Sequence, residues 1–539
     1  MKRILLPLLA LASALVLTSA PAHAQTPDAA ILDSLQYTAF RYFWVEANAA
    51  NGLVKDRSTA NSPASIAATG FGLSAMCIGA DHGWITRQQA RDRVLTTLNT
   101  FVNGPEGTAS TGIIGNKGLF YHFLDMGTAT RAGSSELSTI DTALLFAGIL
   151  DVRQYFDGVD VNETLIRTFA DSIVHRADWN FARNLHPYIL MGWKPNTEGG
   201  FGSYGGWIGY NEGLLLYVIA SGSPTHGVPN PAAWNAWTSG YSWQTWYGYD
   251  FLVCPPLFTH QYPACWVDFR DKRDAYMLGK NSDYFQNSVR ASLAQVQYCS
   301  QNPNHMLGYS DSLWGLTASD DPSGYVAHGA PPAQSDDDTI TPTAAISSLP
   351  FTPAESMRCI RNLWNNYRTY ARPASNPLWG VYGFKDAFNL GFQWVGTDYL
   401  GIDQGPILLM IENARTGKVW QRMMANADIQ RGLASAGFQS YVLGVGGPHD
   451  PLAGLALAAP SPNPLHGSSS ITYSLPRAGR VRLAVYDVTG RQVAVLAAGE
   501  RAAGTHRESF DAAGLPDGVY LTRLEMGGLE RTQRCVVLH

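Results

Sequence analysis

At positions 205–220 the sequence reads Gly205-Gly206-Trp207-Ile208-Gly209-Tyr210-Asn211-Glu212, followed by Gly213-Leu214-Leu215-Leu216-Tyr217-Val218-Ile219-Ala220. The second half has no polar face over three turns, which predicts a helix buried on all sides. Its first turn would carry Glu212 from the core into a glycine- and aromatic-rich loop, and loops on a rigid scaffold commonly carry function. Two interpretations stay open here: Glu212 is a general acid, or it complements the helix dipole behind an N-cap at Asn211.

Composition limits the classes of ligand. The chain has 539 residues, which is long enough for two or more domains. Aromatic residues make up 11% of it and charged residues only 15%, beside 53 glycines. Many Trp and Tyr side chains with few charges suit a protein that stacks on neutral, hydroxyl-rich ligands. They do not suit one that neutralises phosphates.

The first 24 residues predict a cleaved bacterial signal peptide. Lys2 and Arg3 form a basic start, residues 4–17 are apolar, and Ala22-His23-Ala24 is a small-x-small cleavage site. The apolar run is short for a membrane span, so we expect a secreted, periplasmic or cell-surface protein. Removal of the signal peptide leaves 36 basic and 43 acidic residues, a net charge of −7. This charge argues against nucleic acids and polyanionic sugars as partners.

The cysteines show no pattern of a metal or redox site. Six are scattered without zinc or redox spacing, and we expect no metal. Cys254 and Cys265 can form a disulfide in an oxidising compartment, and buried free thiols are the alternative.

Residues 25–447 are expected to be helical, with little period-two alternation. About eleven helices are predicted, near residues 28–49, 63–80, 86–101, 138–155, 162–175, 212–220, 284–299, 341–348, 353–370, 404–414 and 418–434. Residues 228–282 are expected to be irregular. Helical hairpins with long, unequal loops indicate an α/α toroid with a carbohydrate groove at its mouth, and a large irregular helical domain is the alternative.

The composition changes after Gly447. Residues 448–464 read as a linker, with Pro460, Pro462 and Pro464 near its end. Period-two runs then follow, which predict a small all-β sandwich over residues 465–539. The expected strands are 471–475, 481–486, 493–496, 518–524 and 534–538.

Three further acids stand where a buried helix is expected to begin. Glycoside hydrolysis needs one protonated and one ionised carboxyl group. Glu136 and Asp141 precede or open an apolar helix, and Asp403 follows a glycine- and aromatic-rich loop in the same way. The alternatives are a capping box from Ser138 to Asp141 and an N-cap at Asp403. Glu412 is expected to point inward and to pair with a core arginine.

A helix N-terminus lowers the pKa of a carboxyl group, which opposes a general-acid role for Glu212. Burial against Trp207 and Tyr210, or a like-charged neighbour, would raise that pKa. Other aromatic and polar side chains in glycine-rich loops are candidate sugar contacts, with core packing as the alternative for each. The predicted substrate-binding residues are Tyr121, His122, Trp193, Trp207, Tyr210, Asn211, Gln261, Trp314 and Trp394, with Trp379 as a further platform.

Six motifs occur in order between about residues 28 and 440. They are Gly118-Leu-Phe-Tyr-His-Phe-Leu-Asp125, Ser135-Glu-Leu-Ser-Thr-Ile-Asp-Thr-Ala-Leu-Leu145, Gly209-Tyr-Asn-Glu212, Ser223-Pro-Thr-His226, His260-Gln-Tyr262 with Trp266-Val-Asp-Phe-Arg270, and Gly401-Ile-Asp-Gln-Gly-Pro406 with Ile411-Glu-Asn413. Together they resemble the glucoamylase-like domain family, which includes the endo-β-1,2-glucanases of glycoside hydrolase family 144.

The resemblance implies an (α/α)6 barrel and inverting hydrolysis of β-1,2-glucan to sophorooligosaccharides, without a metal or other cofactor. It implies that Glu212 is the general acid and that Glu136 and Asp141 line the catalytic centre. Asp403 is the candidate for the base side, with Asp141 as the alternative, and activation of the attacking water through a substrate hydroxyl stays open as well. Inversion predicts a carboxyl separation of about 6.5–9.5 Å, or more with a relay. Related bacterial families act on other glucans or from chain ends, so these alternatives stay open.

The C-terminal segments Tyr486-Asp-Val-Thr-Gly490, Gly504-Thr-His506 and Leu515-Pro-Asp-Gly-Val-Tyr520 resemble the immunoglobulin-like domain of flagellar hook-capping proteins. Similar modules end many secreted proteins as sorting or surface-attachment domains. The resemblance implies a partner in the secretion machinery or at the cell surface, and no chemistry.

Two other functions are considered for the helical domain. A polysaccharide lyase would need a Tyr or His base and basic residues for a uronate, and the negative charge counts against it. A non-catalytic glycan-capture protein would keep the aromatic loops but has no reason to place three acids at buried helix starts.

Overall fold

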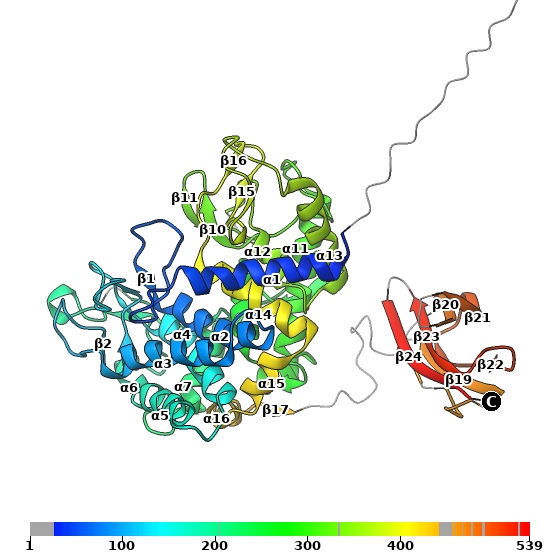
Figure 1. Cartoon of the computed structure of the whole chain (residues 1–539), viewed down its shortest axis with the longest axis horizontal. Coiled ribbons are helices and arrows are strands. Elements are labelled where there is room, and N and C mark those ends of the chain that lie inside the picture. Colours follow the sequence, from blue (N-terminus) through cyan, green and yellow to red (C-terminus); the bar gives the residue numbers. More distant parts are fainter. Residues whose placement is uncertain are drawn as a thin grey trace, which may run out of the picture. The chain divides into compact units, whose positions relative to one another are not determined.

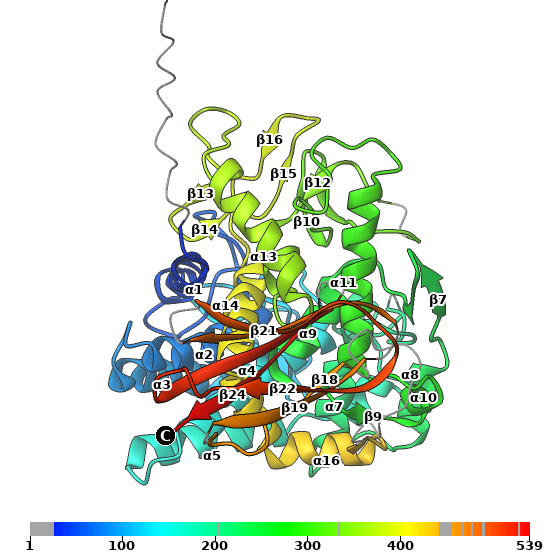
Figure 2. The same cartoon turned by 90° about the vertical axis from the view of Figure 1, so that its right-hand side faces the viewer.

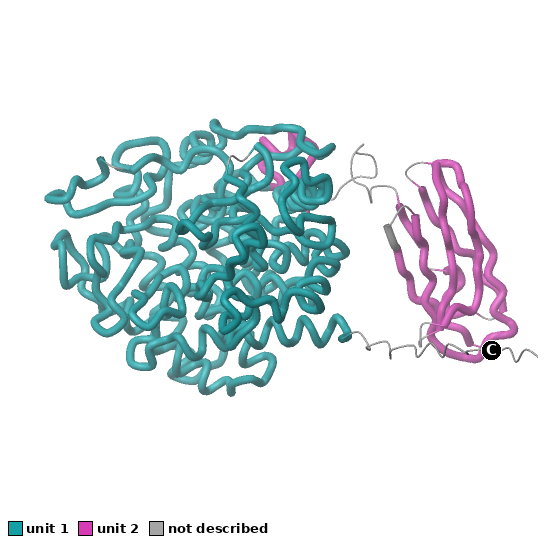
Figure 3. Tube along the Cα trace, turned by 90° about the horizontal axis from the view of Figure 1, so that it is seen from above, with its two compact units in different colours: residues 1–270, 284–438 teal, residues 271–283, 439–539 magenta. Residues whose placement is uncertain are grey.

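The computed structural model describes residues 26–538 apart from 203, 333–334, 441–454, 459, 466, 476–477, 488–490 and 527–528. The chain divides into two compact units, residues 1–270 with 284–438 and residues 271–283 with 439–539 (Figure 3). The expected signal peptide lies outside the described residues. Of the expected linker, the structure describes 455–458 and 460–464.

Six helices of the first unit have most of their residues buried, and Figure 1 shows the course of the helical unit. The six buried helices are α2 (Ile66–Asp81), α4 (Thr139–Tyr155), α7 (Gly213–Gly222), α9 (Phe258–Trp266), α12 (Pro342–Ser347) and α14 (Gly401–Arg415). Every residue of α7 is buried, as the missing polar face predicts. Helix α2 packs against α4 and α14, α7 against α4 and α9, and α14 against α9 and α12. Gln261 of α9 connects to α12 by donating to Ala344 O at 2.7 Å and Ser348 Oγ at 2.9 Å.

More amphipathic helices cover this buried set. Helix α1 packs on α14, α3 on α2, α5 on α4, α16 on α7, α15 on α4 and α14, α11 on α9, and α13 on α12. Their bounds are α1 (Asp28–Val45), α3 (Arg87–Asn103), α5 (Val161–His175), α11 (Tyr284–Gln301), α13 (Pro353–Asn362), α15 (Lys418–Met424) and α16 (Ala427–Ser435). Short helices are α6 (Trp179–Arg183) and α8 (Ala232–Thr238), with a 3-10 turn at Asn196–Glu198 and a π-helix at Leu363–Tyr367.

Short antiparallel strands line the loops of the first unit. The pairs include β1 with β4, β5 with β6, and β12 with β15, and the first member of each pair leads directly into α2, α4 or α12. The strands are β1 (Ala64–Ser65), β2 (Gly115–Asn116), β3 (Leu119–Phe120), β4 (Phe123–Leu124), β5 (Leu137–Ser138), β6 (Gly192–Trp193), β7 (Trp243–Trp246), β8 (Tyr249–Leu252), β10 (Ala318–Asp321), β11 (Gly324–Ala327), β12 (Thr339–Ile340), β13 (Trp379–Gly380), β14 (Gly383–Phe384), β15 (Phe388–Asn389) and β16 (Trp394–Val395).

The predicted helices are found, and their caps explain several boundaries. Thr86 caps α3 in a capping box with Gln89, and Ser138 caps α4. The prediction was wrong for 228–282, which contains α8 and the buried α9. Helix α9 contains Pro263 and has no polar face, so neither helical periodicity nor a clear stop marks it. The single helix expected at 418–434 is two helices, α15 and α16.

All six cysteines lie among the described residues, and each is a free thiol. The disulfide considered between Cys254 and Cys265 is not formed, and the free-thiol alternative is confirmed. Cys265 lies in α9 and is fully buried. Among the described residues, no helix combines the length and apolar character that a membrane span needs.

The second unit contains an antiparallel sandwich of a three-stranded sheet, β18-β19-β22, and a four-stranded sheet, β21-β20-β23-β24 (Figure 2). The strands are β18 (Ala456–Leu457), β19 (Ser468–Leu475), β20 (Gly479–Asp487), β21 (Gln492–Arg501), β22 (Gly504–Asp511), β23 (Gly518–Met526) and β24 (Leu529–Val537). Segment 271–283 adds β9 (Lys272–Arg273), which pairs with β17 (Gln439–Ser440), and α10 (Ala275–Gly279).

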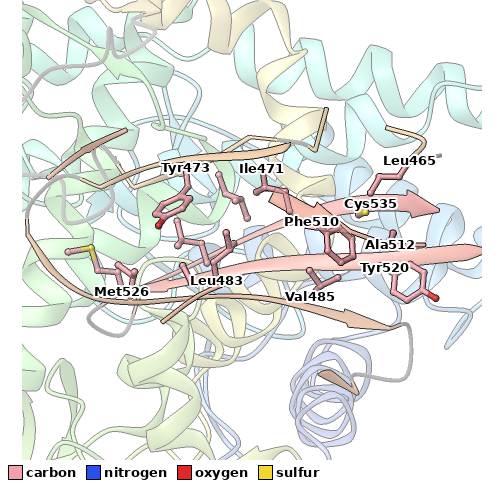
Figure 4. Close-up of a cluster of buried hydrophobic side chains, with 14 of the residues drawn as sticks. Leu465, Ile471, Tyr473, Leu483, Val485, Phe510, Ala512, Tyr520, Met526 and Cys535 are labelled. Atoms are coloured by element: carbon pink, nitrogen blue, oxygen red, sulfur yellow. The ribbon is translucent and has the colours of Figure 1, made fainter. Parts of the chain in front are cut away.

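Side chains from both sheets form the sandwich core, among them Tyr473, Leu483 and Phe510 (Figure 4). Alternate residues of β19 are buried, as its period-two pattern predicts. Strand β22 was not predicted from the sequence. Its residues are mostly polar and only Phe510 is buried, so it lacks an alternating apolar signal. A helical domain with a C-terminal all-β region is thus confirmed.

Candidate active site

The acids singled out in the sequence lie at the starts of three buried helices. Glu212 is the N-cap residue of α7, Asp141 is the third residue of α4, and Asp403 is the third residue of α14. Asp403 is therefore not the N-cap of its helix, a position that Leu400 occupies. Each acid follows a loop that short strands or turns hold in place.

Glu212 does not use its carboxyl group as a helix cap. Asn211 does this instead, because its Oδ1 accepts from the N–H of Gly213 at 2.9 Å. Burial, opposed by a hydrogen bond from its own backbone and helped by the charge of Asp141, raises the pKa of Glu212 to about 7. The carboxyl group can therefore hold a proton near neutral pH, which a general acid requires.

Aromatic side chains around Glu212 fix its loop. Trp207 Nε1 donates to Thr139 Oγ1 at 3.0 Å, which ties the loop before α7 to the start of α4. Tyr217 Oη donates to the carbonyl of Trp207 at 2.9 Å. Tyr210 Oη lies 3.1 Å from His260 Nδ1. Trp207 and Tyr210 are 7% and 6% exposed, so both act mainly as buried supports of the loop.

His122 lies between two acids at the start of α4. Its Nδ1 is 2.9 Å from Glu136 Oε1, and its Nε2 is 3.6 Å from Asp141 Oδ1. Burial disfavours the charged ring, but the charge of Asp141 and the hydrogen bond to Glu136 outweigh it and raise the pKa of His122 to about 9. Burial likewise opposes ionisation of Glu136, yet its hydrogen bond with His122 lowers the pKa of Glu136. The ring of Phe123 stacks on His122 at 3.8 Å.

The capping interpretation of Asp141 also holds. The N–H of Asp141 donates to Ser138 Oγ at 3.3 Å, and Ser138 Oγ donates to Asp141 Oδ2 at 2.5 Å. The other carboxylate oxygen of Asp141 is the one that faces His122. One residue thus caps α4 and contributes to the acidic cluster, so the two interpretations are compatible.

A second acidic pair lies at the start of α14. Asp403 is 3% exposed, and Asp386, which follows β14, is 2% exposed. Their carboxyl groups act directly on each other, and Asp386 Oδ1 and Asp403 Oδ2 meet no hydrogen-bond donor. Burial and then the charge of Asp386 raise the pKa of Asp403 well above its ordinary value. The N–H of Asp320 donates to Asp386 Oδ2 at 2.7 Å.

The guanidinium of Arg57 forms ion pairs with three neighbouring carboxylates. Arg57 Nε lies 3.2 Å from Asp56 Oδ2, and Arg57 Nη1 lies 3.2 Å from Asp320 Oδ2 and 4.0 Å from Asp398 Oδ2. The N–H of Gly401 donates to the carbonyl of Asp56 at 2.8 Å, which holds this loop against the start of α14. Burial raises the pKa of Asp56 and of Asp320 despite Arg57.

Electrostatic interactions connect these groups into one site. Besides burial, the charge of Asp141 acts on both Glu212 and Asp56, and that of Asp56 acts on Asp403. Tyr262 of α9 is buried, and the charges of Asp403 and Glu212 both act on its hydroxyl. Groups on α4, α7, α9 and α14 therefore act on one another electrostatically.

A family model described as "Putative glucoamylase" matches residues 204–427. The crystal structure of a putative glucoamylase from Bacteroides uniformis is 32% identical, with a TM-score of 0.70 over 78% of this chain and 99% of the other. The chain belongs to the glucoamylase-like family.

Two other relatives of this glucoamylase-like chain have more specific names. An endo-β-1,2-glucanase from Chitinophaga pinensis, solved with sophorotriose and glucose, is 29% identical, with a TM-score of 0.69 over 77% of this chain and 99% of the other. An exo β-1,2-glucooligosaccharide sophorohydrolase from Parabacteroides distasonis is 30% identical over 442 residues, which is 75% of this chain. The match spans 57% of that relative's length. Residues 461–538 match a model described as a secretion system C-terminal sorting domain.

Several aromatic residues predicted to bind substrate lie in the core of the glucoamylase-like unit. Tyr121 and Trp314 are fully buried, and Trp193 is 3% exposed. The guanidinium of Arg131 lies 4.7 Å from the ring centroid of Tyr121. The alternative of core packing therefore describes these three residues.

The other predicted binding residues divide between core and surface. Gln261 is 1% exposed and uses its amide to connect α9 and α12. Trp379 and Trp394 are partly exposed. Trp379 packs edge-on against Trp364, with ring centroids 5.0 Å apart. Among the aromatic candidates, Trp379 and Trp394 thus keep accessible surface for a ligand.

Glu412 corrects one expectation. It points inward as predicted, but its partners are not arginines. It accepts from Gln36 Nε2 at 3.0 Å and Thr416 Oγ1 at 2.6 Å, and His82 Nε2 lies 2.8 Å away. Although burial opposes it, these hydrogen bonds lower the pKa of Glu412.

Across the described residues, no group of three or more His, Cys, Asp or Glu side chains could hold a metal ion.

Sequence reasoning missed Asp56, Arg57, Asp320, Asp386 and Tyr325. Tyr325 lies on β11, and after burial the charge of Asp403 contributes most to raising its pKa. A weak signal existed for the first two, since Lys55-Asp56-Arg57 is a charged run between two apolar helices. The others lie in short loops and hairpins that no motif marks.

Proposed function

We propose that this protein is an exported glycoside hydrolase that cleaves β-glucan, most specifically β-1,2-glucan, with inversion. The observation that carries the proposal is Glu212, a carboxyl group whose pKa is raised to about 7 by burial beside Asp141. Glu212 can therefore hold the proton that the acid must give, and Asp403, which lies against Asp386, is the candidate on the base side. Acid and base are the two roles that inverting glycoside hydrolysis requires.

In the proposed reaction Glu212 gives its proton to the glycosidic oxygen as the bond to the anomeric carbon breaks. Water attacks the opposite face of that carbon, with its proton taken on the side of Asp403, directly or through a substrate hydroxyl. Glu136, His122 and Asp141 form a fixed ion triad beside Glu212, and the charge of Asp141 helps to keep Glu212 protonated.

The names of two relatives support the proposed linkage. The Chitinophaga pinensis structure is named an endo-β-1,2-glucanase, and the Parabacteroides distasonis relative is named an exo-acting sophorohydrolase. Both names concern β-1,2-linked glucose, so we propose this linkage. We propose endo action, with exo action as the alternative. We also propose that the six buried helices form the inner ring of an (α/α)6 toroid, with sugar contacts at Trp379 and Trp394.

Export is proposed from both ends of the chain. The sorting-domain match at residues 461–538 supports export and association with the cell surface. Residues 1–24 have the pattern of a signal peptide. We propose residues 25–447 as the hydrolase, 448–464 as a linker and 465–539 as the domain that the secretion machinery reads.

The test is release of reducing ends from linear β-1,2-glucan, with β-1,3-, β-1,4- and α-1,4-glucans in parallel. Wild type and Glu212→Gln are compared, because Gln keeps the size of the side chain but cannot donate a carboxyl proton. We expect activity on the β-1,2 polymer alone, lost in the variant. Product sizing distinguishes short mixed oligosaccharides, from endo action, from sophorose alone. The anomer first formed, read by NMR, tests inversion.

Other outcomes would identify the alternatives. Activity on another glucan would keep the acid and overturn the linkage. An ultraviolet-absorbing unsaturated product would indicate a lyase. Binding without turnover in wild type would indicate a glycan-capture protein and overturn the proposal.

A further inference from the structure

Asp386 and Asp403 form a contact between two carboxyl groups in the interior. They are 2% and 3% exposed, and each carboxyl group acts directly on the pKa of the other. Asp386 Oδ1 and Asp403 Oδ2 are buried, and neither oxygen meets a hydrogen-bond donor. An ionised carboxylate is an acceptor only, so two carboxyl groups can form a hydrogen bond only when one carries a proton. A proton held between the two carboxyl groups would give both buried oxygens a partner.

The cation that acts on Asp386, Arg57, is engaged with other carboxylates and does not replace the shared proton. Arg57 forms its close ion pairs with Asp56 and Asp320, both at 3.2 Å. The titratable and charged groups that face the pair come from three directions. They are Asp320 of β10, Tyr325 of β11, Tyr262 of α9, and Asp56 and Arg57 of the loop before β1. Four of the five are acidic or neutral, so the environment favours retention of the shared proton.

The position of the pair connects it to the reaction. Asp403 is the third residue of α14, and the charges of Asp403 and Glu212 both act on Tyr262. Asp386 lies behind Asp403, and it also accepts from the N–H of Asp320 at 2.7 Å. This N–H stabilises a negative charge on Asp386, which leaves the proton on Asp403 in the resting state.

We propose that Asp386 is a positioning residue for Asp403 and that the two carboxyl groups, with one proton and one negative charge between them, take the proton of the attacking water. The inference rests on the proposed function. As water bonds to the anomeric carbon, its proton moves to Asp403 and the proton of Asp403 moves to Asp386. The glycosidic bond breaks, and its oxygen takes the proton of Glu212. One proton then returns from the pair to Glu212 through solvent.

Asp386→Asn tests the role of the pair in turnover. The amide would donate a hydrogen bond to Asp403 and remove a negative neighbour, so Asp403 would ionise at lower pH and be a weaker base. We expect kcat to fall at least about tenfold with KM within about twofold. The acid limb of the kcat profile should move about one unit to lower pH. Asp386→Glu keeps a carboxyl group and should restore part of kcat.

The matched control is Asp311→Asn, which removes a carboxylate from an exposed ion pair with Arg358. It should leave kcat, KM and the pH profile unchanged. Thermal midpoints of all variants show whether they fold. An Asp386→Asn enzyme that folds and retains the wild-type kcat and acid limb would overturn the proposal.

Infrared spectroscopy tests the shared proton without any substrate. In a Glu212→Gln background at pH 7, we expect a carbonyl band of a protonated carboxyl group. The band should disappear on adding Asp386→Asn or Asp403→Asn and persist on adding Asp311→Asn. Absence of the band overturns the proposal whatever the activity. A band together with no hydrolysis of any glucan by wild type would leave the shared proton in place and overturn both the catalytic step and the proposed function.

Discussion

Helices α4 and α14 each carry one acid near the start and another buried acid near the end. The partners of the carboxyl groups differ between the two ends. At the end of α4, Asp151 is fully buried and forms a two-bond ion pair with Arg422, at 2.6 and 3.1 Å. At the end of α14, Glu412 is 1% exposed and has hydrogen-bond partners on both oxygens. At the start of α14, Asp403 meets another acid instead.

The comparison shows what burial alone does not reveal. A buried charge is costly unless it is paired and hydrogen-bonded, so acids at the helix ends are neutralised by partners. At the starts of α7 and α14, burial and then the charge of a neighbouring acid raise the pKa of Glu212 and Asp403. Such perturbed groups cluster at functional sites. We therefore expect substitutions at the starts to change rate and substitutions at the ends to change stability.

The largest effect should come from Glu212→Gln. Loss of a general acid is expected to lower kcat by about 10²–10⁴-fold, while KM changes little. The thermal midpoint should stay the same or rise, since the substitution removes an acid whose charged form is disfavoured in the folded protein. A variant that loses its fold together with its activity would contradict the division between the two ends.

Asp151→Ala should have the opposite profile. It leaves the guanidinium of Arg422 buried without its partner, which is expected to cost about 3–5 kcal/mol of the free energy of unfolding. Denaturant midpoints measure this loss. At low temperature, where the variant is folded, kcat should match wild type. Asp171→Ala, which removes a partly exposed ion pair with Arg153, is the control and should cost less than about 1 kcal/mol.

The pH dependence of stability should differ in sign between the two ends of α14. The pKa of Asp403 is raised in the folded state, so the folded state holds a proton that the unfolded chain has lost above about pH 4. Its contribution to stability therefore falls as pH rises from that value toward the folded pKa. Asp403→Asn should remove this loss. Relative to wild type, the free energy of unfolding of the variant should be higher at pH 8 than at pH 4 by at least about 1.4 kcal/mol.

Glu412 gives the opposite sign because its pKa is lowered in the folded state. Its stabilisation is present above the ordinary glutamate value and is lost as pH falls through the folded pKa. Glu412→Gln should therefore destabilise the protein most at neutral pH. Urea midpoints at several pH values measure both effects. If the change in stability relative to wild type had the same pH dependence in Asp403→Asn and Glu412→Gln, the comparison would be refuted.

The smallest expected effect is on the basic limb of the activity profile. Glu212 must be protonated, so activity should fall as pH rises above about 7. Burial is the main cause of this raised pKa and Asp141 a lesser one. Asp141→Asn should therefore move the limb to lower pH by less than about one unit, in addition to lowering kcat. An unshifted limb would show that the charge of Asp141 does not reach Glu212, and Asp311→Asn serves again as the control.

The sequence by itself determined the helical elements and the candidate acids. The unbroken apolar run after Glu212 fixed a helix without an exposed face, and it is fully buried. Thr86 and Ser138 marked helix starts because their side chains satisfy free N–H groups. Glu212, Asp141 and Asp403 could be selected because each stands where a loop meets such a helix. These features depend on neighbours within a few residues.

Only the tertiary structure decided which partners surround each acid. Glu412 faces His82 and Gln36 rather than an arginine, and Asp403 faces Asp386, because helices and loops distant in the sequence pack together. The same packing enclosed Trp314, which the sequence could not distinguish from a surface platform. Burial and like-charged contacts set the pKa of a carboxyl group, and both arise only when separate segments meet.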